Sequence, residues 1–317
     1  MLQISINWLI YDLLNFSKTS LLVKSFNFFI YDTIKILFLL IFMITLIGIL
    51  RTYIPPYKIR EWIVNKHPFI RHLSAALFGA FTPFCSCSSI PLFLSFIQTN
   101  VPLGVALTFL ITSPILNEYL FVLMIGAFGL KIALLYAASG ISIGIISGMI
   151  LGKMNLEQYL EQDIAATSSL EEDYYPTFKS RITFGLNEAL SVTKKIWKWV
   201  VVGVAIGALI HNYVPQETIQ TLIDLGGPFT VTIATILGVP IYGSCAAIVP
   251  IAVVLFNKGV SLGTALAFMM AVAAISLPEA IILRRAMNIR LIGIYFGVVA
   301  IAIIVTGYLF NFLVIFI

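Results

Sequence analysis

Charged residues are scarce in this sequence. Only 10% of its 317 residues are Asp, Glu, Lys or Arg, and 60% are hydrophobic, whereas a soluble domain averages about 25% charged residues. Too little polar surface remains to coat a globule in water, which excludes a soluble protein. The apolar runs are long and continuous rather than short and alternating, which argues against a β-barrel. The sequence therefore predicts a polytopic all-α membrane protein.

Motifs for cofactors, metals and nucleotides are also missing. The sequence has no H-E-x-x-H motif, no Walker motif and no glycine-rich nucleotide fingerprint, so we expect no cofactor, no resident metal, no enzymatic activity and no ATP-driven step. The net charge of +5 is modest and is typical of loops that face anionic lipid, not of a nucleic-acid surface. The three histidines (His67, His72, His211) are predicted to lie in loops at the ends of spans.

The N-terminal segment lacks a basic n-region and a small-residue cleavage site, so no cleavable signal peptide is expected. Residues 1–32 fit an amphipathic lead at the membrane interface, and a disordered lead is the alternative.

Six apolar stretches have the length of a membrane span: about 33–50, 103–129, 132–152, 197–214, 260–283 and 291–315. Two further stretches, 72–98 and 228–256, are interrupted by prolines and small polar residues. The segment 153–195 is rich in Asp and Glu and is predicted to be a soluble linker.

Four blocks on either side of this linker resemble one another in the same order, with offsets between 157 and 160 residues. Tyr53 corresponds to Tyr213, and "LGVALTF" at Leu103–Phe109 corresponds to "LGTALAF" at Leu262–Phe268. "TPFCSCSSIPL" corresponds to "VPIYGSCAAIVPI". Convergent membrane composition would not keep the offset constant, so the sequence predicts a duplication. The expected parts are an N-terminal lead (1–32), membrane repeat 1 (33–152), an acidic linker (153–195) and membrane repeat 2 (196–317).

Charge predicts the orientation of the repeats. Segment 51–71 carries five Lys and Arg residues, whereas the equivalent segment 211–227 carries none. By the positive-inside rule, the first lies in the cytoplasm and the second outside. Two repeats of opposite orientation form an inverted-topology repeat, which is typical of secondary transporters. Each repeat then holds about three full spans plus one broken, re-entrant segment; alternatively 72–98 spans the membrane and the next segment folds back at Pro114.

Prolines interrupt the same segment of each repeat. Each proline removes a backbone donor and crowds the preceding turn, and non-helical backbone survives in a membrane only in protein or beside a watery cavity. We therefore expect paired helix breaks at a midplane site, with simple kinks as the alternative. The helix-breaking residues are Pro83, Pro91, Pro240, Gly243 and Pro250.

All three cysteines lie inside these two segments. A cluster of thiols suits a soft, thiophilic solute, although free cysteine also commonly fills space in a core. The predicted substrate-binding residues are Cys85, Ser86, Cys87, Ser88, Ser89, Tyr242, Ser244 and Cys245.

Two carboxylates, Glu118 and Glu279, follow prolines at roughly equivalent points of the repeats. An ionisable residue within a span is costly and marks a functional candidate, so both are predicted to couple transport to protons. An interfacial position near Arg284 is the alternative for Glu279. Supporting polar groups are Thr82, Ser113 and Asn117.

"TPFCSCSSIPL", "TSPILNE", "GSCAAIVPI" and "SLPE" resemble the predicted-permease family that includes the organoarsenical efflux permease ArsP and YraQ-type permeases. The resemblance covers about 35–315. It implies a multi-span permease and, for the ArsP branch, export of trivalent organoarsenicals through Cys85, Cys87 and, less directly, Cys245.

The sequence thus predicts a secondary-active permease in the cell membrane with a cytoplasmic linker. Its expected partners are the lipid bilayer and a small soft solute, and a homo-oligomer is compatible with the sequence. The alternatives are a permease for a sulfur compound or small anion, a membrane thiol–disulfide oxidoreductase working with a thioredoxin-like partner, and a channel.

Overall fold

The computed structural model describes residues 21–52, 66–81, 86–160, 177–213, 227–241, 245–257, 259–284 and 286–313. Within these ranges every regular element is an α-helix or a short 3₁₀ helix, and the one β-type pairing is an isolated bridge between Leu160 and Met287. The predicted all-α class is confirmed.

The helices form two series with the same order: one long helix, four short ones and a final long one. The first series is α2 (Leu21–Arg51), α4 (Pro68–Phe81), α5 (Ser86–Gln98), α6 (Leu103–Ile115), α7 (Glu118–Phe128) and α8 (Leu130–Lys153). The second is α10 (Phe178–Tyr213), α12 (Thr230–Gly238), α13 (Cys245–Asn257), α14 (Leu262–Ala274), α15 (Leu277–Leu283) and α16 (Ile289–Leu313). Two 3₁₀ segments, η2 (Leu156–Tyr159) and η3 (Gly227–Phe229), follow α8 and precede α12.

Among the described residues, three helical stretches are long and apolar enough to cross a membrane: Leu130–Lys153, Leu262–Leu283 and Ile289–Leu313. A fourth results if Leu103–Ile115 and Leu120–Phe128, which meet at a bend of 47°, form one broken span. These stretches coincide with four of the six predicted spans, and they agree with a multi-pass membrane protein.

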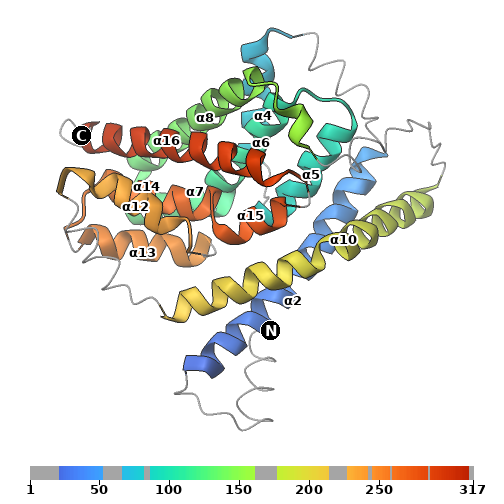
Figure 1. The fold of residues 1–317 in the computed structure, drawn as a ribbon, viewed down its shortest axis with the longest axis horizontal. Helices are drawn as coiled ribbons and strands as arrows, with labels where there is room; N and C mark the ends of the chain where they lie inside the picture. The colour runs from blue at the N-terminus through green and yellow to red at the C-terminus, as the bar shows by residue number, and fades with distance from the viewer. Residues whose placement is uncertain are drawn as a thin grey trace.

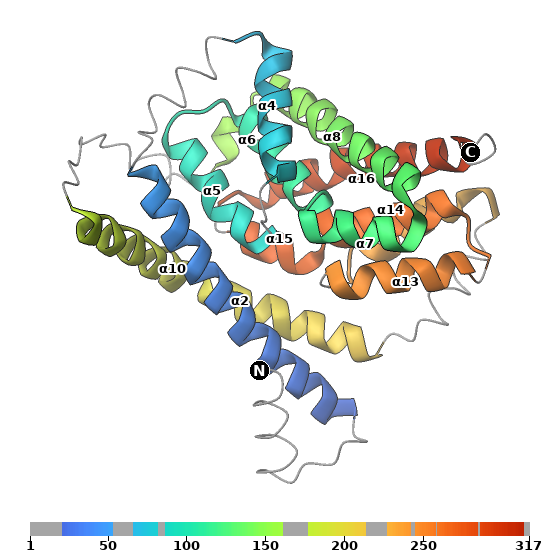
Figure 2. The ribbon, with the colours of Figure 1, turned by 180° about the vertical axis from the view of Figure 1, so that it is seen from behind.

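The centre of the molecule is formed by α6 and α14, whose side chains are almost all buried. Helix α8 packs against α6 and α16 against α14, and α8 and α16 also contact each other. The long helices α2 and α10 run side by side along one edge (Figures 1 and 2). Both begin earlier than the sequence predicted, because α2 starts within the expected lead and α10 within the expected linker.

Glycines allow the central helices to touch through their backbones. A Cβ atom on Gly104 of α6 would lie 2.7 Å from the carbonyl oxygen of Gly148 on α8. In the second half, a Cβ atom on Gly263 of α14 would collide with the carbonyl oxygen of Gly307 on α16. Small residues at such crossings are how helices pack closely within a membrane.

Two prolines predicted to break helices do not do so. Pro91 is the sixth residue of α5 and Pro250 the sixth residue of α13. At that position proline removes a single hydrogen bond near the start of the helix, and the remaining backbone groups still gain most from a helix in an apolar setting. Pro240, by contrast, lies in the turn after α12, whereas Pro83 and Gly243 lie outside the described residues.

Candidate functional site

The candidate site lies where the short helices of each half are interrupted. Helix α4 ends at Phe81 and α5 begins at Ser86, while α12 ends at Gly238 and α13 begins at Cys245. A second interruption in each half separates α6 from α7 and α14 from α15. Each half therefore has two helices, of 7–13 residues, that begin at an interruption, and the positive end of a helix dipole favours negative or electron-rich partners.

Several predicted site residues fall outside the described residues: Thr82, Pro83, Cys85, Tyr242, Gly243 and Ser244. The others begin the two helices, with Ser86, Cys87 and Ser88 in the first turn of α5 and Cys245 as the first residue of α13. Ser89 is fully buried. Because Pro91 and Pro250 hold the same helical position, Cys245 corresponds to Ser86, one position before Cys87.

The two halves exchange contacts around these interruptions. Helix α5 of the first half packs against α15 of the second, and α13 of the second half packs against α7 of the first. The cysteine-bearing helix of each half is therefore a neighbour of the carboxylate-bearing helix of the other half.

A backbone hydrogen bond joins the two interruptions of the second half. The N–H of Leu277, at the start of α15, donates to the carbonyl oxygen of Val239 at 2.8 Å. This bond connects the residue before Pro240 to the helix that carries Glu279.

The two predicted carboxylates have different environments. Glu118 is the first residue of α7 and is exposed. Glu279 is the third residue of α15, has only 2% of its surface exposed, and interacts electrostatically with Tyr295 of α16. A buried carboxyl group within the bundle is the stronger candidate for a functional role.

The supporting polar residues Asn117 and Ser113 lie at the start of α7 and inside α6. The Asn117 side chain caps α7, since its Oδ1 accepts a hydrogen bond from the backbone N–H of Leu120 at 2.7 Å, which satisfies one of the free donors of the first turn. Ser113 is fully buried in α6.

Two buried polar positions were not predicted from the sequence. The hydroxyl of Tyr136 donates to the carbonyl oxygen of Ile115 at 3.1 Å, where α6 ends. His72, expected in a loop, lies inside α4 with its Nδ1 2.7 Å from the Thr108 hydroxyl on α6. Its place in an apolar run, within the predicted segment 72–98, was the available signal. In the part of the chain that the structure describes, no three His, Cys, Asp or Glu residues gather as metal ligands would.

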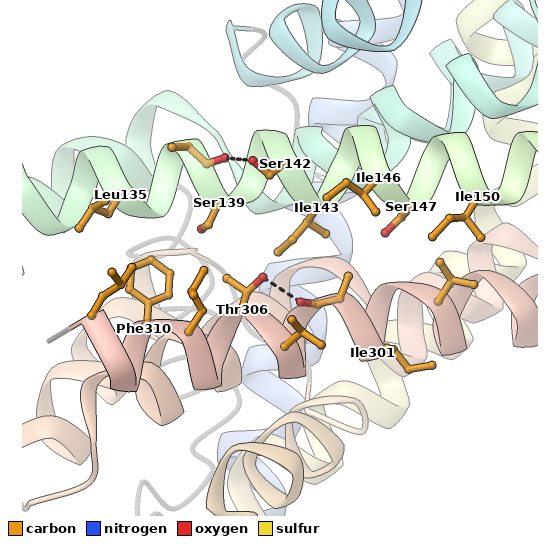
Figure 3. A pocket seen from close by; sticks show the side chains of 16 residues that line it. Leu135, Ser139, Ser142, Ile143, Ile146, Ser147, Ile150, Ile301, Thr306 and Phe310 are labelled. Carbon is orange, nitrogen blue, oxygen red and sulfur yellow. Dashed lines mark hydrogen bonds between the residues drawn. The ribbon is translucent and has the colours of Figure 1, made fainter. Parts of the chain in front are cut away.

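A groove of about 670 Å³ runs between α8 and α16 (Figure 3). Its floor is buried, with Ile143, Ser147 and Phe310 at most 3% exposed, while its rim is exposed, with Ile301 and Val305 above 60%. The lining is apolar apart from a few hydroxyl groups. No feature of the sequence predicts this groove.

The sequence is similar to those of several known proteins. A family described as "Predicted permease" (ArsP_1) matches residues 21–312. A UPF0718 protein of Methanocaldococcus jannaschii is 24% identical over 77% of this chain and 83% of its own length. The UPF0718 protein YcgR of Bacillus subtilis is 21% identical over 78% and 84%.

A third relative, from Streptococcus mutans, is named as a subunit of a two-component membrane permease complex. It is 22% identical over 55% of this chain and 58% of its own length. No solved structure matches the chain.

Proposed function

The chain belongs to the predicted-permease family, and on that premise we propose that it is a secondary-active permease with a substrate site between two inverted repeats. The observation that carries this proposal is the repeated series of six helices, in which the interrupted helices of one half pack against those of the other. The repeats are 33–152 and 196–317, joined by the cytoplasmic linker 153–195, in the plasma membrane.

Packing supports the relation between the halves. Residues 159 positions apart make equivalent contacts: Gly104 meets Gly148, and Gly263 meets Gly307. The contacts α2–α10, α6–α14 and α8–α16 each join a helix to its own counterpart, which is the pattern that a pseudo-two-fold axis produces. Clusters of Lys and Arg residues follow the first long helix in the first half but lie in the N-terminal part of that helix in the second half. Since the positive-inside rule places both groups in the cytoplasm, the two halves have opposite orientations and this axis lies in the membrane plane.

The substrate is a soft, thiol-reactive solute such as a trivalent organoarsenical. The first turns of α5 and α13 carry Cys87 and Cys245, and sulfur ligands select soft centres. A species RAs(OH)₂ exchanges two hydroxyl groups for two thiol sulfurs; each thiol proton leaves with one hydroxyl as water, and no electrons are transferred. The same exchange in reverse releases the solute.

Proton coupling is assigned to Glu279. Its burial favours it over the exposed Glu118, because a carboxyl group removed from water is costly to ionise and therefore binds and releases protons with changes in its surroundings. Glu118 then serves the first turn of α7, where a negative charge stabilises the helix.

The test is transport of a trivalent organoarsenical into inverted vesicles that contain the purified protein. Replacing Cys85, Cys87 and Cys245 together by serine is expected to abolish uptake. The control is Ser95→Ala, on the same helix as Cys87, which is expected to leave uptake unchanged. Full uptake by the triple variant would rule out binding through sulfur.

A permease for a small anion is the second candidate, favoured by the serines Ser86 and Ser88 in the first turn of α5 and by the N-terminus of that helix. The purified protein is heated with a panel of soft metalloids, sulfur compounds and small anions, before and after alkylation of its thiols. Stabilisation by an anion that survives alkylation favours this candidate, whereas stabilisation by a metalloid that is lost on alkylation favours the first.

A further inference from the structure

The groove between α8 and α16 is built from equivalent positions of the two halves. Ser142 and Ile301, Ile146 and Val305, and Ser147 and Thr306 all line it, and the members of each pair are 159 residues apart. It therefore lies where the last helix of each half faces its counterpart, and it is distinct from the interruptions proposed to hold the solute.

The surroundings of this groove are those of a protein–lipid boundary. Helices α8 and α16 are the least buried of the candidate spans, and the rim residues Ile146 and Ile301 are more than half exposed. In a membrane these aliphatic side chains face hydrocarbon.

The dimensions of the groove indicate which kind of molecule fits it. From Leu135 to Ile150 it extends ~22 Å along α8 at 1.5 Å per residue. With a volume of about 670 Å³ spread over that length, the groove is long and narrow. A hydrocarbon chain, which is long and thin, matches this shape.

Hydroxyl groups are spread along the groove. Ser139, Ser142 and Thr306 donate their hydroxyl hydrogens to carbonyl oxygens of their own helices at 2.7–2.8 Å. The hydroxyl of Ser147, although fully buried, makes no hydrogen bond within the residues that the structure describes. Figure 3 shows Ser147 and Ile150 toward one end of the groove, opposite the end with Leu135 and Phe310.

The end of the groove with Ser147 and Ile150 leads to two positive charges. Lys153 ends α8, and Arg290 is the second residue of α16; both are exposed. The two helix ends are held together, because the N–H of Asn288 donates to the carbonyl oxygen of Tyr159 at 2.8 Å. Lys153 lies ~9 Å along the helix beyond Ser147.

We propose that this groove binds one anionic phospholipid, with an acyl chain between α8 and α16, its ester carbonyl at the Ser147 hydroxyl and its phosphate beside Lys153 and Arg290. Each part of the lipid then meets a matching part of the protein. The aliphatic lining takes the chain, the free hydroxyl donates to the carbonyl, and the basic pair attracts the phosphate.

The experiment is native mass spectrometry of the full-length protein in detergent, titrated with phosphatidylglycerol or phosphatidylcholine. We expect one tightly retained phosphatidylglycerol per chain. Ala302→Trp, which fills the groove, is expected to weaken this binding at least tenfold, whereas Leu134→Trp, on the exposed outer face of α8 but outside the lining, leaves it unchanged.

Two milder variants keep the test decisive if Ala302→Trp does not fold. Ser147→Ala is expected to weaken phosphatidylglycerol and phosphatidylcholine equally, by about fivefold. Lys153→Gln with Arg290→Gln is expected to remove the preference for phosphatidylglycerol.

Three results would overturn the proposal. The first is equal retention by the Ala302→Trp and Leu134→Trp variants, which would mean unspecific annular lipid. The second is no effect of either milder variant. The third is a protein that is dimeric until Ala302→Trp makes it monomeric, which would make a second copy the occupant. This experiment does not measure organoarsenical transport. Its result is therefore independent of whether the proposed substrate is correct.

Discussion

The side-chain Oδ1 of Asn311 on α16 accepts a hydrogen bond from the backbone N–H of Gly263 on α14 at 2.8 Å. Gly263 is the second residue of its helix, so this N–H has no acceptor within α14. The equivalent positions of the first half are Gly152 and Gly104, where the two backbones approach each other directly. Both halves thus have backbone contact at this crossing, and the second half adds a side-chain cap.

Asn311→Ala is expected to lower the free energy of unfolding by ~1 kcal/mol, because the Gly263 N–H loses its acceptor. Thermal unfolding of the purified protein in detergent measures this change. Asn311→Asp, which keeps the accepting oxygen, serves as the control and is expected to unfold near the wild-type temperature. Equal stability of all three proteins would contradict the capping role.

Gly104→Ala is expected to destabilise the protein by ~1–3 kcal/mol, since the added methyl group meets the backbones of Gly148 and Gly152 at 2.7 Å and neither helix can yield locally. Gly126→Ala in α7 is the matched control. A Cβ atom there has no neighbour within 4 Å, so the better helix propensity of alanine leaves stability unchanged or raised by up to ~1 kcal/mol. Similar unfolding temperatures for the two variants would refute close backbone contact between α6 and α8.

The equivalent tyrosines Tyr136 and Tyr295 are expected to respond differently to loss of the hydroxyl group. Tyr136→Phe removes the hydrogen bond to Ile115 and is expected to cost ~1 kcal/mol. Tyr295→Phe removes a buried hydroxyl that makes no hydrogen bond among the described residues, so stability is expected to stay the same or rise. Thermal unfolding of the two single variants measures both changes in stability. A larger loss of stability for Tyr295→Phe than for Tyr136→Phe would show that the Tyr295 hydroxyl has a partner.

Glu279→Gln is expected to reduce proton-coupled transport at least tenfold without unfolding the protein, because glutamine has the same shape but cannot release a proton. Glu118→Gln, at an exposed position, is expected to keep most of the activity. The measurement is solute uptake into vesicles with and without an imposed pH gradient. Loss of uptake in Glu118→Gln alone would return the coupling role to Glu118.

The sequence predicts the repeat because the offset of about 159 residues survives at positions where packing tolerates little change. Leu103–Phe109 and Leu262–Phe268 begin the two central helices, and their glycines lie at the closest helix crossings. Residues that must fit against a backbone keep their spacing, so the similarity between the two halves can still be detected in the sequence.

The positions of helix ends are less predictable. Pro91 and Pro250 suggest a break by local chemistry, yet both lie inside helices, because the cost of one missing hydrogen bond is small beside that of exposing several polar groups to an apolar environment. His72 was assigned to a loop for the opposite reason: its polarity suggested water, whereas the Thr108 hydroxyl provides a partner inside the protein.

The groove between α8 and α16 could not be predicted. Its lining residues, such as Ile146 and Val305, have the same apolar character as any side chain facing lipid. Only the packing of the two helices separates the buried floor from the exposed rim.

The glycine contacts have a mechanical consequence. At the closest points of the α6–α8 and α14–α16 crossings, backbone lies against backbone, which leaves little room for one helix to slide along the other. Each pair therefore moves as a rigid body. Any alternation between inward-open and outward-open states must then be accommodated where the two halves meet, as at the α5–α15 and α7–α13 contacts.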